Sequence, residues 1–148
     1  MTEADRALLL SLSAPSLLAL TMYGEARGES VEARIGVGCV VRNRVRTQYR
    51  GASYHGVCLE RLQFSCWNDD DPNQAVLTTI ARDLTRHTTQ AEDFRETLFL
   101  AEGIVGDQLR DLTRGARHYH DVSVRPSWAR EDRRVLRLGR LIFYVGIA

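Results

Sequence analysis

The sequence predicts a single, predominantly helical α+β domain, and three observations lead to this fold class. The chain has 148 residues, of which 44% are hydrophobic and 26% charged, enough to bury the core of an ordinary soluble domain without disulfides or metal ions. Apolar residues recur at helical spacing over most of residues 3–105. The last part of the chain instead alternates and is rich in β-branched and aromatic residues. One domain over residues 1–148 is therefore expected.

The first two helices are expected over residues 3–12 and 16–27. Pro15 separates them, because proline breaks a continuing helical pattern. Gly28 follows the second helix and suits its C-terminal cap. The apolar run here lacks a basic leading segment and is divided by Pro15, so it does not have the pattern of a signal peptide. No stretch is long enough to span a membrane as a helix, and no stable membrane association is expected.

A third helix is expected to start after Ser30 and to run to about residue 45. Ser30 is a suitable N-cap, and the segment that follows is apolar on nearly all sides. A buried strand is the alternative, but the length and the polar sequence RNRVR at its end favour a central buried helix. Gly36 and Gly38 would weaken such a helix, so we expect another element to pack closely against them.

Residues 47–72 have the composition of a long loop, and loops of this length are more often functional than idle. Asp71 and Pro72 then open a helix, and a further helix is expected over residues 92–105. The predicted apolar faces are Val76, Ile80 and Leu84 in the first, and Phe94, Leu98, Ala101 and Val105 in the second. After Gly106, the segments ARHYHDV and GRLIFYVGI indicate a small β element near the end of the chain.

The charge composition argues against nucleic-acid binding. The formal net charge is +1, and all 20 basic residues are arginine, so there is no general electrostatic case for such a partner. Arginine clusters at Arg42, Arg44, Arg46 and Arg50, and again over residues 125–140. We interpret each cluster as a solvated face or as cations that complement a helix C-terminus. An anionic polymer held on that face is the lesser alternative.

Three cysteines, Cys39, Cys58 and Cys66, leave at least one thiol unpaired, which argues against a disulfide framework. Cys58 and Cys66 are far enough apart to close a bridge in an oxidising compartment, and the sequence does not decide whether they do. No Cys or His pair has the spacing of a structural zinc site.

Two glutamates in the sequence YGEARGE are candidate acids. Glu25 and Glu29 would share a helix face, with Cβ atoms about 6 Å apart, if both were helical. Solvated surface charge is the ordinary interpretation of either. Glu25 differs because it lies among core residues, where burial raises the pKa of a carboxyl group and so suits a general acid. Glu29 lies at the start of the next helix, so we assign it a structural role.

The two histidines of the sequence HYH, His118 and His120, alternate, so their rings would face the same side of a strand. A metal site would need a third ligand, such as His55 or an acidic residue, and none is recognisable. Histidines that form hydrogen bonds on the wall of a cleft are the favoured interpretation.

Aromatic residues supply another candidate feature. Their rings have an apolar face, and tyrosine and tryptophan add a polar group, a combination that suits stacking on a sugar. The candidates are Trp67, Trp128, Tyr119 and Phe64, and core packing is favoured for Phe64.

Four segments together resemble a known family. In chain order they are LALTMYGEARGESVEARIGVGCVVRNRV, QFSCWN, GARHYHDVSVRPSWA and LGRLIFY. This set is similar to the cell-wall hydrolase family of SleB- and CwlJ-like spore cortex-lytic enzymes and related phage endolysins. The similarity covers most of the chain from about Leu17 onward. YGEARGE followed by NRV is a specific motif, and the ordered set is more specific still.

The resemblance implies a lysozyme-like fold, similar to the catalytic domains of goose-type lysozymes and soluble lytic transglycosylases. It implies cleavage of peptidoglycan between N-acetylmuramic acid and N-acetylglucosamine, and makes Glu25 the catalytic acid. No cofactor is expected and no metal ligand is assigned, although the sequence does not decide whether a metal binds near His118 and His120. The implied substrate contacts are Gln63, Phe64 and Ser65 of QFS, His118, Tyr119 and His120 of HYH, and Trp128 of PSWA. Many relatives have a histidine in the final pattern GxHxFY, where this sequence has Leu141, which cannot supply a polar group.

A single good carboxylate favours a lytic transglycosylase that forms 1,6-anhydro-N-acetylmuramic acid. Glu25 would protonate the leaving oxygen and then remove a proton from the muramic 6-hydroxyl, while the substrate's N-acetyl group or the pocket stabilises the cationic centre. A hydrolytic muramidase with the same site is the first alternative. A metal-dependent amidase or peptidase that uses HYH, and a non-catalytic wall-binding module, are the others.

The expected partner is the glycan strand of peptidoglycan, bound by a monomer in the periplasm or outside the cell. Without an evident signal, the chain is expected to be synthesised in the cytoplasm and, if it is phage-derived, to be released to the wall by a holin. A bacterial enzyme exported by another route is the alternative.

Overall fold

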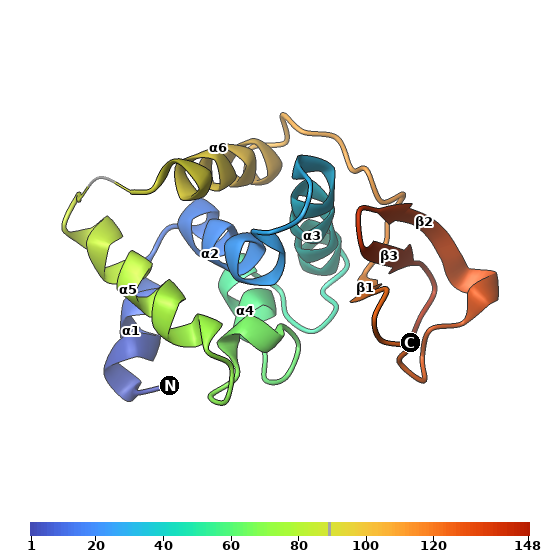
Figure 1. Cartoon of the computed structure of the whole chain (residues 1–148), viewed down its shortest axis with the longest axis horizontal. Helices are drawn as coiled ribbons and strands as arrows, with labels where there is room; N and C mark the ends of the chain where they lie inside the picture. The colour runs from blue at the N-terminus through green and yellow to red at the C-terminus, as the bar shows by residue number, and fades with distance from the viewer. Residues whose placement is uncertain (89) are drawn as a thin grey trace.

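Six α-helices and a three-stranded sheet make up the fold in the part of the chain described by a computed structural model, residues 1–88 and 90–148 (Figure 1). The helices are α1 (Glu3–Ser11), α2 (Ala14–Ala26), α3 (Val31–Arg46), α4 (Tyr54–Cys58), α5 (Asn73–Thr85) and α6 (Glu92–Val105). The strands are β1 (His118–Asp121), β2 (Arg134–Leu138) and β3 (Leu141–Tyr144), and two short 3-10 helices are η1 (Ser65–Trp67) and η2 (Glu131–Arg133). None of the described helices combines the length and the apolar character needed to cross a membrane.

Serine side chains fix where α2 and α3 begin. Ser13 Oγ accepts a hydrogen bond from the backbone N–H of Ser16 at 3.3 Å, and Ser30 Oγ accepts one from that of Ala33 at 3.2 Å. Each bond satisfies a backbone donor that has no partner within its own helix. The N-cap predicted at Ser30 is confirmed, and the expected helices agree with α1, α2, α3 and α6 to within about two residues.

The turn between α2 and α3 differs from the expected glycine cap. Gly28 does not adopt the left-handed conformation of a C-terminal glycine cap. Instead α2 ends on Arg27 in right-handed conformation, and the backbone N–H of Glu29 donates to the carbonyl of Ala26 at 3.0 Å. The prediction for Gly28 was wrong because this tight right-handed turn leads directly to the Ser30 cap and requires no positive φ.

Helices α2 and α3 form the centre of the molecule. In Figure 1, α6, α5 and α4 surround α2, and α3 lies between α2 and the sheet. All of residues 17–23 in α2 are buried. A Cβ atom on Gly36 would lie 2.6 Å from Phe143 Cζ of β3, and one on Gly38 would overlap Ile104 of α6. The predicted central position of α3 and the close packing at its glycines are confirmed.

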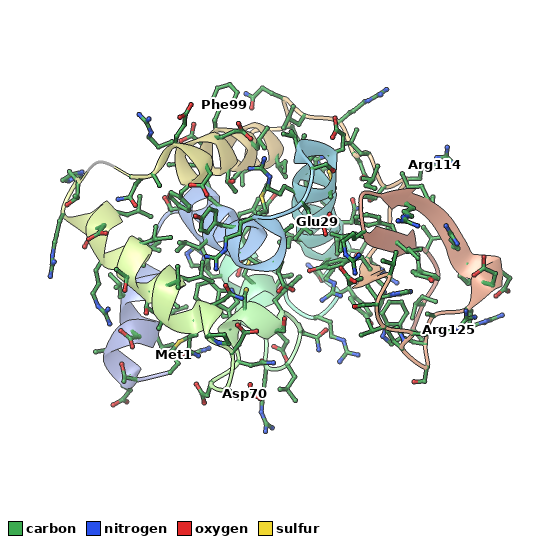
Figure 2. All side chains as sticks on the ribbon, viewed as in Figure 1. Met1, Glu29, Asp70, Phe99, Arg114 and Arg125 are labelled. Atoms are coloured by element: carbon green, nitrogen blue, oxygen red, sulfur yellow. The ribbon has the colours of Figure 1, made fainter. Side chains whose placement is uncertain are left out.

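The buried faces of α5 and α6 agree with the expected ones in part. Phe94 and Ala101 are buried as expected, and Ile80, Leu84, Leu98 and Val105 are partly buried against the core. The buried residues are Leu77, Thr78 and Ala81 in α5, and Phe94, Thr97, Ala101 and Ile104 in α6. Val76 is 40% exposed, and Phe99 projects outward from α6 in Figure 2 and is 75% exposed. The threonines are buried because each hydroxyl donates to a carbonyl of its own helix, as Thr78 Oγ1 does to Gln74 at 3.0 Å. A prediction based on the spacing of apolar residues does not identify buried threonines.

The first arginine cluster is not a solvated face throughout. Arg42 is 3% exposed and Arg44 is 5% exposed. The Arg42 guanidinium donates to the carbonyl oxygens of Ile104 and Leu109, at 3.0 and 2.7 Å, and so satisfies carbonyl groups at and beyond the end of α6. The interpretation as a solvated face was wrong for these two residues because they lie on a helix that is surrounded by other elements.

The sheet consists of antiparallel strands in the order β1-β3-β2. Strand β3 is the predicted final strand, and β1 lies in the predicted alternating segment. Tyr119 of β1 pairs with Phe143 of β3. Strand β2 was not expected, because its arginines Arg134 and Arg137 are exposed and make the segment resemble a solvated surface. Because β3 is central, β1 and β2 form the two edges of the sheet, and both contact α3.

All three cysteines are free and buried. The structure therefore contains no bridge between Cys58 and Cys66, the pair that the sequence left undecided. Burial raises the pKa of the Cys58 thiol to about 12 and also raises that of Cys66. These thiols behave as small apolar side chains of the core rather than as nucleophiles.

Candidate active site

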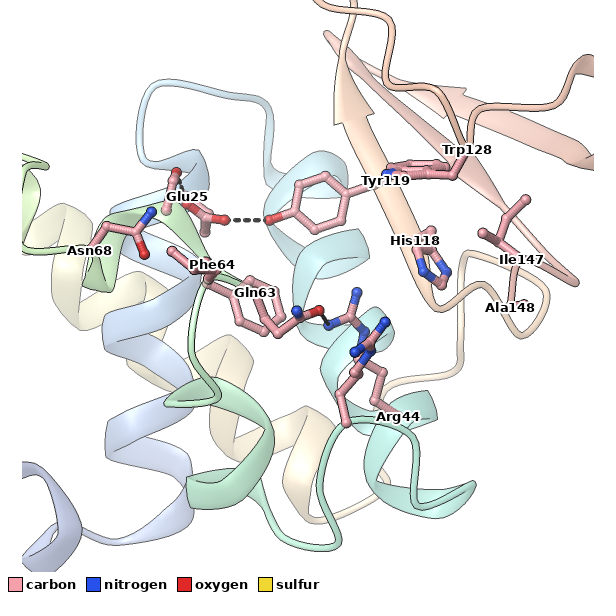
Figure 3. Close-up of a pocket in the computed structure, with 13 residues that line it drawn as sticks. Glu25, Arg44, Gln63, Phe64, Asn68, His118, Tyr119, Trp128, Ile147 and Ala148 are labelled. Carbon is pink, nitrogen blue, oxygen red and sulfur yellow. Dashed lines mark hydrogen bonds between the residues drawn. The ribbon is translucent and has the colours of Figure 1, made fainter.

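A cleft with a volume of about 400 Å³ lies between the helices and the sheet (Figure 3). Its described lining residues are Glu25 of α2, Arg44 of α3, Arg50, Leu62, Gln63, Phe64, Ser65 and Asn68 of the long connection that contains α4 and η1, His118 and Tyr119 of β1, and Trp128, Ile147 and Ala148 near the end of the chain. The cleft thus joins residues from both halves of the sequence. Residues 47–72, predicted as a functional loop, contain two short helices and supply one wall.

Glu25 lies in the last turn of α2, and donors on both sides of the cleft hold its carboxyl group. Tyr119 donates its hydroxyl to Glu25 Oε1 at 2.8 Å, a contact that spans the cleft in Figure 3. On the other oxygen, Oε2, the Ser65 hydroxyl donates at 3.2 Å and the backbone N–H of Cys66 at 3.4 Å. The carboxyl group is therefore fixed in direction while its residue remains partly exposed to the cleft.

The packing of η1 on α2 explains why these donors reach Glu25. A Cβ atom on Gly24 would lie 2.7 Å from both Cys66 Cβ and Leu77 Cδ1, so only glycine allows η1 and α5 to approach α2 this closely. The indole N–H of Trp67 donates to Thr21 Oγ1 at 3.0 Å inside the core. Gly24 therefore permits the contact, and Trp67 fixes it.

The segment QFSCW alternates between core and cleft. Phe64, Cys66 and Trp67 are buried, whereas Gln63 is half-buried and Ser65 is exposed. The buried side chains anchor the segment, and the polar ones between them line the cleft. Of the aromatic candidates for sugar stacking, Trp67 packs in the core, and Phe64 packs in the core, as expected, and also lines the cleft.

The surroundings of Glu25 raise its pKa above the usual glutamate value. Burial is the largest cause, because removal of water disfavours the ionised form, and the negative charge of Asp71 acts in the same direction. The hydrogen bonds from Tyr119, Ser65 and Cys66 lower the pKa but do not cancel the effect of burial. A carboxyl group that retains its proton to higher pH while it is surrounded by donors suits both the acid and the base step of one reaction.

Polar side chains of α3 hold β1 above the cleft. Asn43 Nδ2 donates to the carbonyl oxygen of Ala116 at 2.9 Å, and Arg44 Nε donates to that of Arg117 at 2.8 Å. Both acceptors lie just before β1, which starts at His118. The sequence NRV, residues 43–45, thus places Tyr119 opposite Glu25.

The two faces of β1 have different roles. His118 and His120 both contact Trp128, with ring centroids 5.1 and 5.8 Å away, so their rings face the same side as predicted. Tyr119 points the other way, toward Glu25 (Figure 3). His118 lines the cleft, whereas His120 lies behind it and forms a 2.8 Å hydrogen bond to the Tyr144 hydroxyl.

Burial, followed by the charges of three nearby arginines, lowers the pKa of His118 to about 4. The ring is therefore neutral at physiological pH. Its Nε2 lies 3.1 Å from the Tyr49 hydroxyl, and its Nδ1 is buried without a hydrogen-bond partner among the described residues. Among those residues, no three His, Cys, Asp or Glu side chains form a group that would hold a metal ion.

Comparisons with known proteins identify the family and the fold. The sequence profile of the Cell Wall Hydrolase family matches residues 28–144. The chain belongs to this family. Among solved structures, the catalytic domain of the Bacillus cereus SleB protein matches with a TM-score of 0.59 and 25% identity, over 88% of each chain. Among curated proteins, no sequence matches.

For this cell wall hydrolase, the predicted lysozyme-like α+β fold class is confirmed, and family membership supports an activity that degrades peptidoglycan. The profile match starts at residue 28, so Glu25 lies just before it. The family match therefore does not include the candidate acid.

Two residues outside the cleft explain features of the sequence motif. Glu29 Oε2 accepts a hydrogen bond from the backbone N–H of Arg140 at 3.2 Å, so the second glutamate of GEARGE ties the start of α3 to the turn between β2 and β3. Leu141, the departure from the family pattern, is 4% exposed and packs in the core.

Sequence reasoning missed two basic residues of the cleft wall, Arg44 and Arg50. Gln63 and Arg44 meet there, because Arg44 Nη1 donates to Gln63 Oε1 at 3.2 Å (Figure 3). The apolar character of α3 was the available signal, since a polar residue on a helix that is buried on nearly all sides must be paired inside the protein or face a cavity.

Proposed function

We propose that this protein cleaves the glycan strands of peptidoglycan between N-acetylmuramic acid and N-acetylglucosamine, with Glu25 as general acid and then as general base. The observation that carries the proposal is the setting of Glu25: a carboxyl group with raised pKa in a cleft, held on both oxygens by Tyr119, Ser65 and the N–H of Cys66. Membership of the cell wall hydrolase family supports the substrate class.

The number of carboxylates favours a transglycosylase. Among the described residues that line the cleft, Glu25 is the only acidic side chain. Glycosidases that hydrolyse with two carboxylates place the second about 5 to 9.5 Å from the first, where it attacks the sugar or activates water. With one carboxyl group, the substrate's own 6-hydroxyl can take the part of that second group.

The reaction then has two proton transfers at the same carboxyl group. Protonated Glu25 donates its proton to the glycosidic oxygen as the bond to the muramic anomeric carbon breaks. The substrate's N-acetyl group stabilises the cationic centre. Ionised Glu25 next accepts the proton of the muramic 6-hydroxyl, whose oxygen bonds to the anomeric carbon and closes the anhydro ring. No water is consumed, and Glu25 ends protonated, ready for another cycle.

The residues around Glu25 have distinct parts in this scheme. Tyr119 and Ser65 stabilise the carboxylate between the two proton transfers, because each donates to an oxygen that is then charged. Trp128 and His118 present ring surface to a sugar on the opposite wall, and Gln63 presents an amide. His120 acts indirectly, because it lies behind Trp128.

Product analysis tests the proposal. Purified peptidoglycan is digested by the wild type in water labelled with heavy oxygen, and the fragments are analysed by mass spectrometry. We expect anhydro-muramic ends without label. Labelled reducing muramic ends would instead identify a muramidase that uses the same site. Release of stem peptides, with intact glycan strands, would overturn the assignment as a glycosidase in favour of an amidase or peptidase. Binding without any fragments would indicate a wall-binding module.

A further inference from the structure

Three arginine side chains gather around one tyrosine ring at the end of the cleft. The guanidinium carbons of Arg44, Arg50 and Arg117 lie 5.5, 5.3 and 4.4 Å from the centre of the Tyr49 ring. Arg44 and Arg50 both line the cleft, and Arg44 donates to Gln63 there. The first arginine cluster of the sequence therefore contributes two of its members to the candidate active site.

Within the described part of the chain, none of these cations forms an ion pair. Among the described residues, no carboxylate lies within 4.0 Å of Arg44, Arg50 or Arg117. Two other arginines of α3 differ in this respect, because Arg42 and Arg46 both form ion pairs with the carboxylate of Asp107. Like charges this close repel one another, and the repulsion is stronger where water is excluded.

Arg44 is held rigidly in spite of this repulsion. It is 5% exposed, stacks with its guanidinium carbon 5.2 Å from the centre of the Phe64 ring, and donates through Nε and Nη1 to Arg117 and Gln63. Burial, together with the charges of Arg50 and Arg117, lowers its pKa. A buried cation with neutral partners on only two of its nitrogen atoms is fixed in place and open to an anion.

Peptidoglycan glycan strands carry their negative charge on one sugar. N-acetylglucosamine is neutral, whereas the lactyl group of each muramic residue ends in a carboxylate or in a peptide stem that bears carboxylates. We propose that Arg44 and Arg50 form a subsite for a carboxylate carried by the lactyl side chain of a muramic residue, so that the subsite selects which sugar lies beside them. This inference rests on the proposed function.

Direct binding measurements test the subsite separately from catalysis. Three sets of glycan fragments are titrated into the protein by calorimetry: fragments with peptide stems, fragments with free lactyl carboxylates after removal of the stems, and fragments whose carboxylates are converted to neutral amides. The titrated proteins carry Glu25→Gln, which prevents turnover under the proposed function. Cleavage that persists in this variant would contradict the role of Glu25 without bearing on the subsite.

Arg50 is the residue to substitute, because it is exposed and its replacement leaves the core intact. Arg50→Gln removes the charge, and Arg50→Lys keeps it. Arg114→Gln is the matched control, since Arg114 is also exposed and also has positive φ, 55° against 60° for Arg50, but does not line the cleft. Its position is labelled in Figure 2.

We expect Arg50→Gln to weaken binding of the carboxylate-bearing fragments about threefold to tenfold and to leave binding of the neutral amides unchanged. Arg50→Lys should retain most of the affinity, and Arg114→Gln all of it. A loss with the stem-free fragments alone assigns the lactyl carboxylate, and a loss with the stem-bearing fragments alone assigns a carboxylate of the peptide. A loss with both means that the subsite accepts either carboxylate. Equal losses with charged and neutral fragments, or no loss, would overturn the proposal.

Discussion

The carboxyl group of Glu25 is subject to two opposing influences. Burial favours its protonated form, while the hydroxyls of Tyr119 and Ser65 and the N–H of Cys66 favour its ionised form. A group that must first give and then take a proton benefits from both, because neither form is held too strongly. The balance depends on single hydrogen bonds, so it can be changed one atom at a time.

Tyr119→Phe removes the donor to Glu25 Oε1 and should raise the pKa of Glu25 further, since the lost bond favoured the ionised form. A general acid is active while protonated, so activity falls as the pH rises through its pKa. The alkaline limb of kcat/KM against pH should therefore move to higher pH. Tyr144→Phe, which removes a hydroxyl bonded to His120 instead, should leave that limb in place. A limb that moves to lower pH in Tyr119→Phe would contradict this account.

At the scale of residues, the sequence distinguished Glu25 from Glu29, because one lies among core residues and the other at a helix start. It did not reveal Arg44 as part of the cleft, and Tyr119 entered as a cleft residue without its bond to Glu25. These contacts join residues far apart in the chain, and their geometry follows from tertiary packing rather than from spacing.

The contact between α2 and η1 is the element that positions the acid. Gly24→Ala would place a methyl group against Cys66 and Leu77, and overpacking of this kind costs about 1 to 3 kcal/mol. Because relief would push η1 away from α2, kcat should fall as well. Gly28→Ala is the matched control, since the added Cβ atom would meet nothing within 4 Å and Gly28 does not have a left-handed φ. The stability of this variant should equal that of the wild type or rise slightly. Thermal unfolding and turnover of both variants check this, and equal effects of the two changes would contradict it.

Helix boundaries could be predicted because the signals are local. Ser30 caps α3 as expected, and Pro15, expected to separate the first two helices, lies in the first turn of α2, so each acts within a turn of the boundary that it marks. The sequence predicted the buried faces of α5 and α6 only in part, and it did not predict strand β2. Thr78 and Thr97 are buried through their own hydrogen bonds, and β2 shows exposed arginines. In each case a polar residue lies on a buried helix face or in a strand, and the spacing of apolar residues does not predict such a position.

At the scale of the whole molecule, no disulfide bond stabilises the core. Cys39, Cys58 and Cys66 are all free and buried. We expect a thiol reagent to modify none of them in the native protein and all three after unfolding without a reductant. Counting modified thiols by intact mass checks this. A single modified thiol in the unfolded, unreduced protein would reveal a bridge between two of the cysteines.

The cleft itself is a property of the whole chain, because α2 supplies the acid and β1, nearly a hundred residues later, supplies a donor to it. Glu25→Gln therefore probes the central claim. The raised pKa of Glu25 means that its ionised form destabilises the folded state of the wild type. This loss of stability grows as the pH rises from the ordinary glutamate pKa through the pKa of Glu25 in the folded protein. The variant should thus be at least as stable as the wild type at neutral pH, and thermal unfolding confirms that it is folded.

The most direct test is the rate of glycan cleavage by Glu25→Gln on purified peptidoglycan, beside Asp71→Asn as a matched loss of a nearby carboxylate. Glu25→Gln is expected to lower the rate about 10²- to 10⁴-fold, the contribution typical of general acid and base catalysis, while Asp71→Asn should stay within about threefold of the wild type. A folded Glu25→Gln variant that cleaves at the wild-type rate, or a loss confined to Asp71→Asn, would contradict it.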